Sequence, residues 1–378
     1  MRAGHILRVL RKTDWLLLFA TVVLVLFGLS AIYSVALSHS DTELLNVKKQ
    51  LLAGVIGFTL FVFLTLVNYR LLRSYSLVLY LLGLMCLLAV LWFGNTIRGT
   101  TGWFDFGFLS FQPVEYMKLA LPVALAAYLS ERARRHFGWR ELLESFGITL
   151  VPVIFTLLQP DLGSAMLLLA IWGLMILFAG IPRLQFFLLT GGGILLGVVA
   201  WFFLLADYQK DRILTFFEPE RDPLGIGYNV TQAIIGVGSG GWFGRGLGFG
   251  SQSQLKFIPE SQTDFIFAVI AEELGFIGVT VILLALGALL LAIMRRARTL
   301  TDDFGAFLMV GIGGSLFVQS VVNIGMNLGL LPVTGLGLPL VSYGGSSLLF
   351  TLMMLGIVNS VARSSPQAGS SMIEWKGR

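Results

Sequence analysis

Long apolar stretches alternate with shorter polar connections along the whole chain. Each stretch approaches or exceeds the roughly 20 residues that a helix needs to cross the hydrocarbon core of a bilayer. We therefore predict an all-α, polytopic membrane protein with a single integral membrane domain over residues 1–378. Ten transmembrane helices are expected, at Trp15–Leu37, Gln50–Leu66, Ser74–Phe93, Pro113–Leu129, Leu142–Leu158, Gly163–Ala179, Leu184–Ala206, Phe265–Met294, Phe304–Leu328 and Leu340–Val361.

The composition agrees with this class. Hydrophobic residues make up 56% of the chain, charged residues make up 12%, and the mean hydropathy of +0.85 is far above that of soluble proteins. The net charge of +5 comes from basic residues scattered among the connections, which favours contact with anionic membrane lipids over nucleic acid. A single cysteine, Cys86, and three widely separated histidines argue against a disulfide and against a Cys or His metal site.

Lys and Arg collect in the connections on one side of the predicted bundle, and such a bias marks the cytoplasmic side. Both termini lie on this side, so the N-terminus and the C-terminus are expected in the cytoplasm. The basic positions concerned are Arg2, Arg8, Arg11, Lys12, Arg70, Arg73, Arg132, Arg134, Arg135, Arg140, Arg183, Arg295, Arg296, Arg298, Arg363, Lys376 and Arg378.

The connection between the seventh and eighth helices, residues 207–263, is a long extracytoplasmic loop. Connections of this length are uncommon and usually functional. It contains a literal G-x-G-x-x-G match within Gly236–Gly250. A dinucleotide site needs a strand before this motif and a helix after it, and this segment lies between transmembrane spans, so the match does not predict a dinucleotide site. Two interpretations of the glycines stay open: close approach of the backbone to a ligand, or tight folding of the loop against the bundle.

Asp264 stands where this loop meets the eighth helix, at the edge of an apolar segment. An ionisable side chain at membrane depth costs a few kcal/mol at least and commonly marks a functional site. Asp264 is therefore the candidate catalytic base. The alternative is that it caps the helix expected to begin at Phe265, because Asp is a good N-cap, and position alone does not separate the two interpretations.

Further polar residues lie at the outer ends of other predicted helices. Glu115 and Lys118 are three residues apart on one helical face, where they form a structural ion pair or leave Lys118 to hold an anionic ligand. Asp161, between the fifth and sixth helices, is either a helix cap or part of a cavity wall. The Pro, Gly and Ser residues within Asn323–Ser347 indicate a broken helix over a cavity.

Several motifs occur in an order that resembles a known family. PESQTDFIFAVIAEELG, GSGGWFGRGLGFGSQSQ and LPLVSYGGSS are similar to the SEDS family of bacterial cell-wall polymerases, the RodA, FtsW and SpoVE group, over nearly the whole chain. MNLGLLPVTGLGLPLVSYGG resembles the RodA branch most. The resemblance implies a peptidoglycan glycosyltransferase of the bacterial cytoplasmic membrane that polymerises lipid II on the outer face during cell elongation. It also implies a class B penicillin-binding transpeptidase as partner.

The resemblance also implies roles for individual residues. Asp264 matches the essential aspartate of the family, Glu115 and Lys118 match its paired charges, and Arg212 and Asp161 match further polar positions of its outer cavity.

Two positions depart from the family pattern. Gly102 precedes Trp103 where the family commonly has Arg, which puts a phosphate contact by that arginine in doubt. Gln262 stands where many members have His, so help from a histidine in proton transfer is either not required or not available here.

The expected chemistry needs one base and a source of positive charge. A carboxylate can take the proton of the acceptor hydroxyl, and inversion in one displacement requires no covalent enzyme nucleophile. The leaving undecaprenyl pyrophosphate requires positive charge, for which Arg212 is the first candidate. The long loop also offers Lys210, Arg221, Arg245 and Lys256. The sequence has no metal signature and requires no cofactor, although a divalent cation could share the charge.

Two other classes of function compete with this one. A lipid-linked precursor flippase also has charged residues in its spans and interrupted helices. However, the candidate residues here lie at the outer ends of spans and in one outer loop, whereas alternating access needs a polar route to both faces. A non-catalytic scaffold of the wall-synthesis complex would not explain why ionisable residues converge on one outer face.

Overall fold

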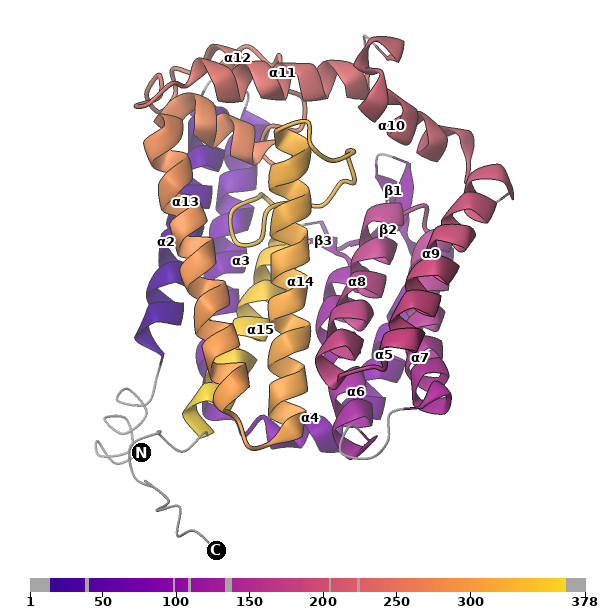
Figure 1. The fold of residues 1–378 in the computed structure, drawn as a ribbon. Helices are drawn as coiled ribbons and strands as arrows, with labels where there is room; N and C mark the ends of the chain where they lie inside the picture. The colour runs from indigo at the N-terminus through magenta and orange to yellow at the C-terminus, as the bar shows by residue number, and fades with distance from the viewer. Residues whose placement is uncertain are drawn as a thin grey trace, which may run out of the picture.

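The computed structural model describes residues 14–37, 41–97, 99–107, 110–132, 138–203, 205–222 and 225–364. Within these ranges the protein is a bundle of long helices with a layer of shorter helices across one end (Figure 1). The expected location of both termini concerns residues outside these ranges, as do the sequence positions His5, His39, His136, Arg2, Arg8, Arg11, Lys12, Arg134, Arg135, Lys376 and Arg378.

The expected helices are present in the expected order. The long ones are α2 (Trp15–Leu37), α3 (Asp41–Leu66), α5 (Ser76–Phe93), α6 (Pro113–Arg132), α7 (Trp139–Leu158), α8 (Leu162–Ala179), α9 (Arg183–Phe203), α13 (Ile266–Thr299), α14 (Asp303–Asn327) and α15 (Gly345–Ser364). A short helix, α4 (Arg70–Ser74), precedes α5. The largest difference from expectation is at α3, whose first turns are polar but rich in helix-forming Glu, Leu and Lys.

Nine of the helices in the described ranges are long and apolar enough to cross a membrane. The remaining long helix, α6, carries Glu115 and Lys118 and lies inside the bundle, where α5, α8 and α14 pack against it. Most of its residues are buried. Because its neighbours shield this part of α6 from lipid, the buried Glu115 and Lys118 side chains do not face the hydrocarbon.

A small antiparallel sheet in the connection between α5 and α6 accompanies the expected all-helical bundle. It consists of β1 (Asn95–Ile97), β2 (Thr100–Asp105) and β3 (Ser110–Phe111), in the order β1-β2-β3. Thr and aromatic residues favour extended backbone here, and the rings of Phe104 and Phe111 stack across two paired strands, 6.3 Å apart.

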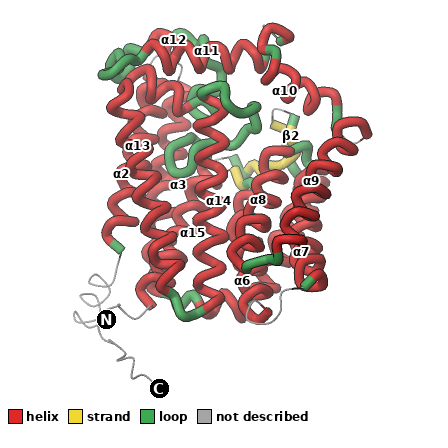
Figure 2. The backbone as a smooth tube through the Cα atoms, in the orientation of Figure 1, coloured by secondary structure: helices red, strands yellow, loops and turns green. Residues whose placement is uncertain are grey.

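The long loop at 207–263 is largely helical. It contains α10 (Asp207–Phe217), η1 (Pro219–Arg221), α11 (Ile226–Ser239) and α12 (Ser251–Gln254). These elements form a layer, called the outer layer here, across one end of the bundle (Figures 1 and 2). It has a small core of its own, in which Ala233 of α11 packs with Ile258, Phe265 and Ala268.

The interruption expected near the last span lies between α14 and α15. Residues 328–344 form no helix and appear as a green loop inside the bundle in Figure 2. The last span was expected to begin at Leu340, but Leu340 has a φ of 67°, which a helix does not allow, and α15 begins at Gly345. This segment is called the inner loop below.

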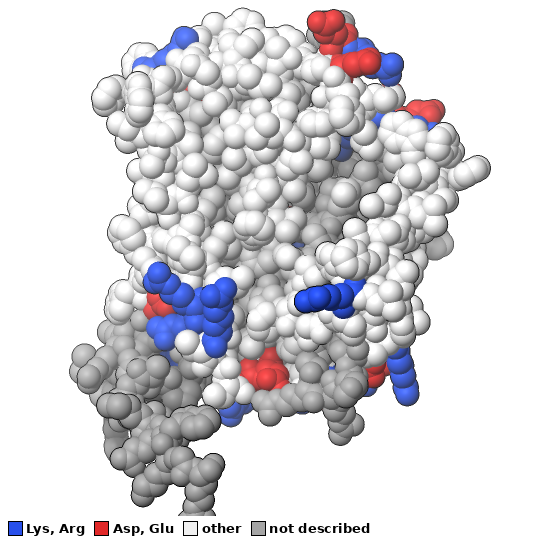
Figure 3. Space-filling model, in the orientation of Figure 1, with Lys and Arg blue, Asp and Glu red and all other residues white. Residues whose placement is uncertain are grey.

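On the face shown in Figure 3, basic side chains gather at the end of the bundle opposite the outer layer. Arg296 and Arg298 lie in the last turn of α13 at that end. The positive-inside rule therefore assigns that end to the cytoplasm and the outer layer to the opposite side.

A labelling experiment tests this orientation. In a Cys86→Ala background, Asp211→Cys in the outer layer should react with a membrane-impermeant thiol reagent added outside intact cells. Thr301→Cys, between α13 and α14, should react only after the membrane is opened, because both positions are exposed but lie at opposite ends of the bundle. The reverse labelling pattern would overturn the assignment of the outer face.

Candidate active site

Asp264 lies in the turn that leads into α13, and its side chain is partly exposed. Its backbone carbonyl accepts two hydrogen bonds from α14, one from Asn323 Nδ2 at 3.0 Å and one from Asn327 Nδ2 at 2.9 Å. Both asparagines are fully buried. Because the two donors are buried away from water, these hydrogen bonds restrain the backbone at Asp264 strongly.

The start of α13 bears on the interpretation of Asp264 as a helix cap. The helix begins at Ile266, one residue later than expected, and Phe265 occupies the N-cap position. The third helical residue, Ala268, has the amide that an N-cap side chain commonly bonds. That amide donates to Asn327 Oδ1 at 3.1 Å, so a side chain of α14 accepts the hydrogen bond that an N-cap side chain of α13 would otherwise accept.

The inner loop folds over the turn that carries Asp264. Ser342 Oγ donates to the Thr263 carbonyl at 2.6 Å, and the amide of Tyr343 donates to the Gln262 carbonyl at 2.8 Å. A methyl group on Gly335 would lie 4.0 Å from Asp264 Oδ2. Gly335 is exposed and has a φ of 79°, so the loop requires glycine where it passes the carboxylate.

Glu115 and Lys118 form the expected ion pair at the start of α6. Lys118 Nζ and Glu115 Oε1 are 2.7 Å apart, and the side chain of Lys118 is only 1% exposed. A buried charge of this kind is stable only when it is paired. The pair is therefore part of the packed structure, with Glu115 supplying the opposite charge beside the buried Lys118.

Asp161 is both a helix cap and a neighbour of this pair. Its Oδ1 accepts from the Ser164 amide at 3.0 Å at the start of α8. Loss of hydration raises the pKa of the Asp161 carboxyl, whereas the bond from Ser164 and the Lys118 ammonium lower it, and the Glu115 carboxylate raises it. Asp161 therefore lies within electrostatic range of the Glu115–Lys118 pair.

The inner loop connects this cluster to Asp264. A methyl group on Gly163, two residues after Asp161, would collide with the Thr334 carbonyl, so the first turn of α8 lies directly against the residue before Gly335. On another side of the loop, Arg212 of α10 lines a small cavity of about 60 Å³ together with Pro332 and Val333. Asp161, Arg212 and Asp264 thus surround one short stretch of the inner loop, residues 332–335.

Arg245 and Lys256 are placed differently. Arg245 Nη1 donates to Ser251 Oγ at 2.8 Å, and its backbone amide donates to the Glu272 carbonyl at 3.0 Å, which places it beside α12 and the second turn of α13. Lys256 is exposed in the turn after α12, with a φ of 61°. Neither is brought to residues 332–335 by these contacts, and their assignment to the substrate stays a prediction.

The two positions that depart from the resembled family pattern, Gln262 and Gly102, lie near Asp264 and Asp161 respectively. Gln262 Oε1 accepts from Asn46 Nδ2 of α3 at 3.1 Å. Gly102 is buried in β2, and a methyl group placed on it would lie 3.4 Å from Gln159 Oε1, two residues before Asp161. In the described ranges, no three His, Cys, Asp or Glu side chains are grouped to hold a metal ion.

The Pro and Gly content of the sequence marks the surrounding segment but does not single out Asn323 and Asn327. The two asparagines are four residues apart and so share one face of α14. Two buried amides on one helical face in a membrane are costly unless they bond, and this was the available signal.

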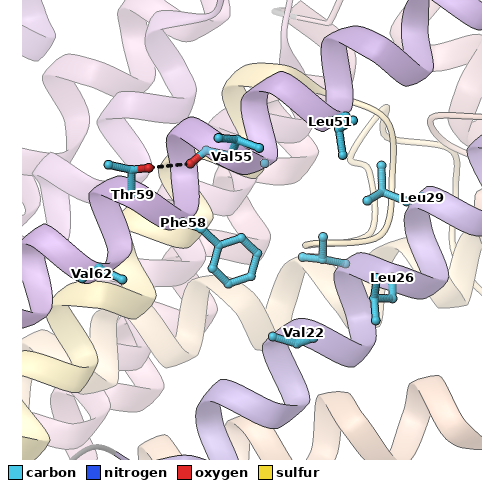
Figure 4. A pocket seen from close by; sticks show the side chains of 10 residues that line it. Val22, Leu26, Leu29, Leu51, Val55, Phe58, Thr59 and Val62 are labelled. Carbon is cyan, nitrogen blue, oxygen red and sulfur yellow. Dashed lines mark hydrogen bonds between the residues drawn. The ribbon is translucent and has the colours of Figure 1, made fainter. Parts of the chain in front are cut away.

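An apolar groove runs along the membrane-facing side of α2 and α3. It measures about 640 Å³, and Phe58 points into it between Val22 and Leu29 (Figure 4). Thr59 also lines it but donates its hydroxyl to Val55 O of its own helix, which leaves the surface apolar. Toward the outer end of α3, Gln50 bonds to the backbone of Ser342 and Gly344, so the groove leads toward the inner loop.

The buried ion pair gives a stability prediction. Glu115→Gln or Lys118→Met alone should lower the melting temperature in detergent strongly, because each strands a buried partner at a cost of about 3–5 kcal/mol. The double variant should regain part of that loss. Arg140 and Glu144 provide the control: they pair at 2.8 Å, but Arg140 is 84% exposed, so replacing Arg140 should leave the melting temperature nearly unchanged. Strictly additive effects at 115 and 118 would contradict the pairing.

Comparison with known proteins places this architecture in a family. The model of the FtsW/RodA/SpoVE family of cell cycle proteins matches residues 10–367. Stage V sporulation protein E of Bacillus subtilis is 39% identical over 93% of this chain and 97% of its own, and peptidoglycan glycosyltransferase MrdB of Escherichia coli is 38% identical over 93% and 95%. The probable peptidoglycan glycosyltransferase FtsW of Haemophilus influenzae is 37% identical over 91% and 89%.

A solved structure gives the same result for the fold. A chain in a peptidoglycan synthase complex, in which polymerization and crosslinking are coordinated, superimposes with a TM-score of 0.80 at 34% identity, covering 94% of this chain and 99% of that one. The relatives at similar identity include SpoVE, MrdB and FtsW proteins, so they do not separate the branches. The chain belongs to the FtsW/RodA/SpoVE family, the SEDS proteins.

Proposed function

We propose that this protein is a peptidoglycan glycosyltransferase that polymerises lipid II at the outer face of the membrane, with Asp264 as the general base. The enzyme class is that of the curated relatives. The assignment of Asp264 as the base rests on the hydrogen bonds at its backbone and on the position of its side chain. Asn323 and Asn327 fix its backbone, while its carboxylate faces the exposed glycine of the inner loop.

The reaction that we propose is a single displacement. Asp264 takes the proton of the acceptor sugar hydroxyl, the hydroxyl oxygen forms the new glycosidic bond, and the bond to the pyrophosphate of the donor breaks. An α-linked donor then gives a β-linked product, so one base is enough and no covalent intermediate forms. A backbone held by buried hydrogen bonds keeps the carboxylate in place without reorganisation during the step.

Positive charge is needed where the pyrophosphate leaves. Arg212 is our first candidate because it lies against residues 332–333, next to the part of the inner loop that passes Asp264. Lys118 is already paired with Glu115, so its role is to set the charge of the cavity wall beside Asp161. Gly102 supplies no charge at its position, and a divalent cation bound with the pyrophosphate would compensate for this.

The apolar groove between α2 and α3 suits the lipid part of the substrate. Its lining is aliphatic and aromatic, it faces the membrane, and its outer end meets the segment bonded to Gln50. A polyprenyl chain lying there would present its pyrophosphate near the inner loop. The chain would then stay in the bilayer while the sugar reacts at the surface.

For the cellular role, we propose cell elongation with a class B penicillin-binding transpeptidase as partner. The sequence of the inner loop and its flanks supports the RodA branch, and the structural relative from a peptidoglycan synthase complex supports a partner. The polymerase would then supply the glycan strand that the transpeptidase crosslinks.

Asp264→Asn tests the proposed base. Asparagine keeps the size of the side chain and caps helices as well as aspartate, but it cannot accept the proton. The purified variant should keep its melting temperature and bind lipid II, while polymer formation falls on the order of 10²–10⁴-fold. The measurement is the rate of glycan polymer formation from lipid II at equal folded protein.

Asp222→Asn is the matched control. Asp222 is an aspartate of the outer layer, and its Oδ2 accepts from the Ile226 amide at the start of α11 at 2.7 Å. Asparagine can make the same bond, so this variant should polymerise at the wild-type rate. If Asp264→Asn is as active as Asp222→Asn, then Asp264 is not the base and the assignment passes to Asp161 or Glu115.

A further inference from the structure

The glycine-rich loop between α11 and α12 carries large aromatic side chains that the protein does not cover. Trp242, Phe243 and Phe249 are 69%, 81% and 76% exposed, and Phe276 of α13 beside them is 57% exposed. The rings of Trp242 and Phe276 lie 5.1 Å apart. We call these four residues the aromatic ridge. An exposed apolar cluster of this size needs an occupant.

Two polar contacts between α2 and α13 indicate the depth of the ridge in the membrane. At one end Arg296 Nε lies 3.1 Å from Asp14 Oδ2, and at the other Ser34 Oγ donates to Glu273 Oε2 at 2.6 Å. At 1.5 Å per residue the stretch from Asp14 to Ser34 is about 30 Å long, which is the thickness of the hydrocarbon core. No charged residue of α2 or α13 lies between the two contacts except Arg295, next to Arg296. The Ser34–Glu273 contact therefore marks the outer edge of the hydrocarbon.

Backbone hydrogen bonds fix the loop at this same level. Gly275 has a φ of 65° and a non-helical ψ, and the next two amides turn away from the helix to the loop. The Phe276 amide donates to the Gly241 carbonyl at 2.8 Å, and the Ile277 amide donates to the Trp242 carbonyl at 3.2 Å. In return, the Gly246 amide donates to the Glu273 carbonyl at 2.9 Å. The loop is therefore held beside Glu273 rather than above it.

Glycine is needed in this loop for a structural reason. Methyl groups on Gly240 and Gly244 would collide with the carbonyls of Ala271 and Glu273, so the two backbones touch. Tight folding against α13 therefore explains Gly240 and Gly244, whereas methyl groups on Gly238 and Gly241 of the G-x-G-x-x-G match would meet nothing within 4 Å. The contact with α13 therefore holds the loop in place, and the loop carries the exposed aromatic side chains on its other face.

We propose that the aromatic ridge is a membrane anchor that inserts into the outer leaflet, with the phospholipids of that leaflet as its occupant. Aromatic residues favour the boundary between headgroups and acyl chains, which is the level found for the ridge. Arg245, exposed in the same loop, is held beside Glu272 by its backbone amide, close to the same level, so its charge would complement that of lipid phosphates there. The anchor fixes the height of the outer layer relative to the membrane surface. It requires only that the protein spans the membrane, and not the proposed reaction.

Fluorescence quenching at single labelled cysteines tests the anchor. In a Cys86→Ala background, Phe243→Cys carries an environment-sensitive fluorophore, and the protein is placed in nanodiscs that contain phosphatidylcholine and phosphatidylglycerol. Quenchers are a nitroxide on the acyl chain near the headgroup, a nitroxide near the chain end, and aqueous iodide. Phe243 is 81% exposed, so the substitution removes no core contact.

Two control positions calibrate the depth. Glu220→Cys, exposed in η1 of the outer layer, should be quenched by iodide alone. Leu284→Cys, on α13 eleven residues beyond Glu273 and 68% exposed, lies about 16 Å deeper and should respond most to the nitroxide near the chain end. The label at position 243 should respond most to the nitroxide near the headgroup and little to iodide.

Two results would overturn the proposal. If the label at position 243 is quenched by iodide as strongly as the label at 220, the ridge faces water. If neither iodide nor either nitroxide quenches it, protein rather than lipid covers the ridge.

Discussion

The outer half of this protein depends on two buried amide side chains of α14. Asn323 and Asn327 bond to the backbone carbonyl of Asp264, and Asn323 also bonds to the Leu336 carbonyl of the inner loop at 2.8 Å. One pair of side chains therefore ties α13, α14 and the inner loop together. Removing Asn323 would take away the donor to the buried Leu336 carbonyl, and removing both amides would do the same at the Asp264 carbonyl, at a cost of about 1–3 kcal/mol for each group. The rigidity of the turn at Asp264 follows from this cost.

The membrane decides where the other charges can lie. Lys118 and Glu115 are enclosed by neighbouring helices and neutralise each other. Glu272 and Glu273 are also buried, but their partners are neutral donors. Glu272 accepts from the backbone amides of Gln252 and Ser253. Glu273 accepts from the Ser34 hydroxyl and the Gln254 side-chain amide. These bonds hold α12 against α13. The polar groups of the outer half thus form two separate clusters, one around the inner loop and one beneath the glycine-rich loop.

Much of the fold could be predicted from the sequence, because a bilayer requires long apolar helices and these are visible in one dimension. The order of the spans and the Glu115–Lys118 pair followed from length and spacing. The sheet at residues 95–111 and the helices of the outer layer did not, since short elements outside the hydrocarbon depend on tertiary contacts such as Ala233 with Phe265. For the site, the sequence singled out Asp264 and Asp161, but not the bonds of Asn327, because those join residues about sixty positions apart.

The central claim is that the polar residues around the inner loop perform chemistry on a lipid-linked sugar rather than moving it across the membrane. The most direct measurement uses purified protein and lipid II in detergent, with the proposed transpeptidase partner present, and analyses the products for glycan polymer. Detergent micelles have no second compartment, so transport cannot contribute. The account predicts polymer under these conditions. Binding of lipid II without polymer, together with transfer of lipid II between leaflets in vesicles, would contradict it.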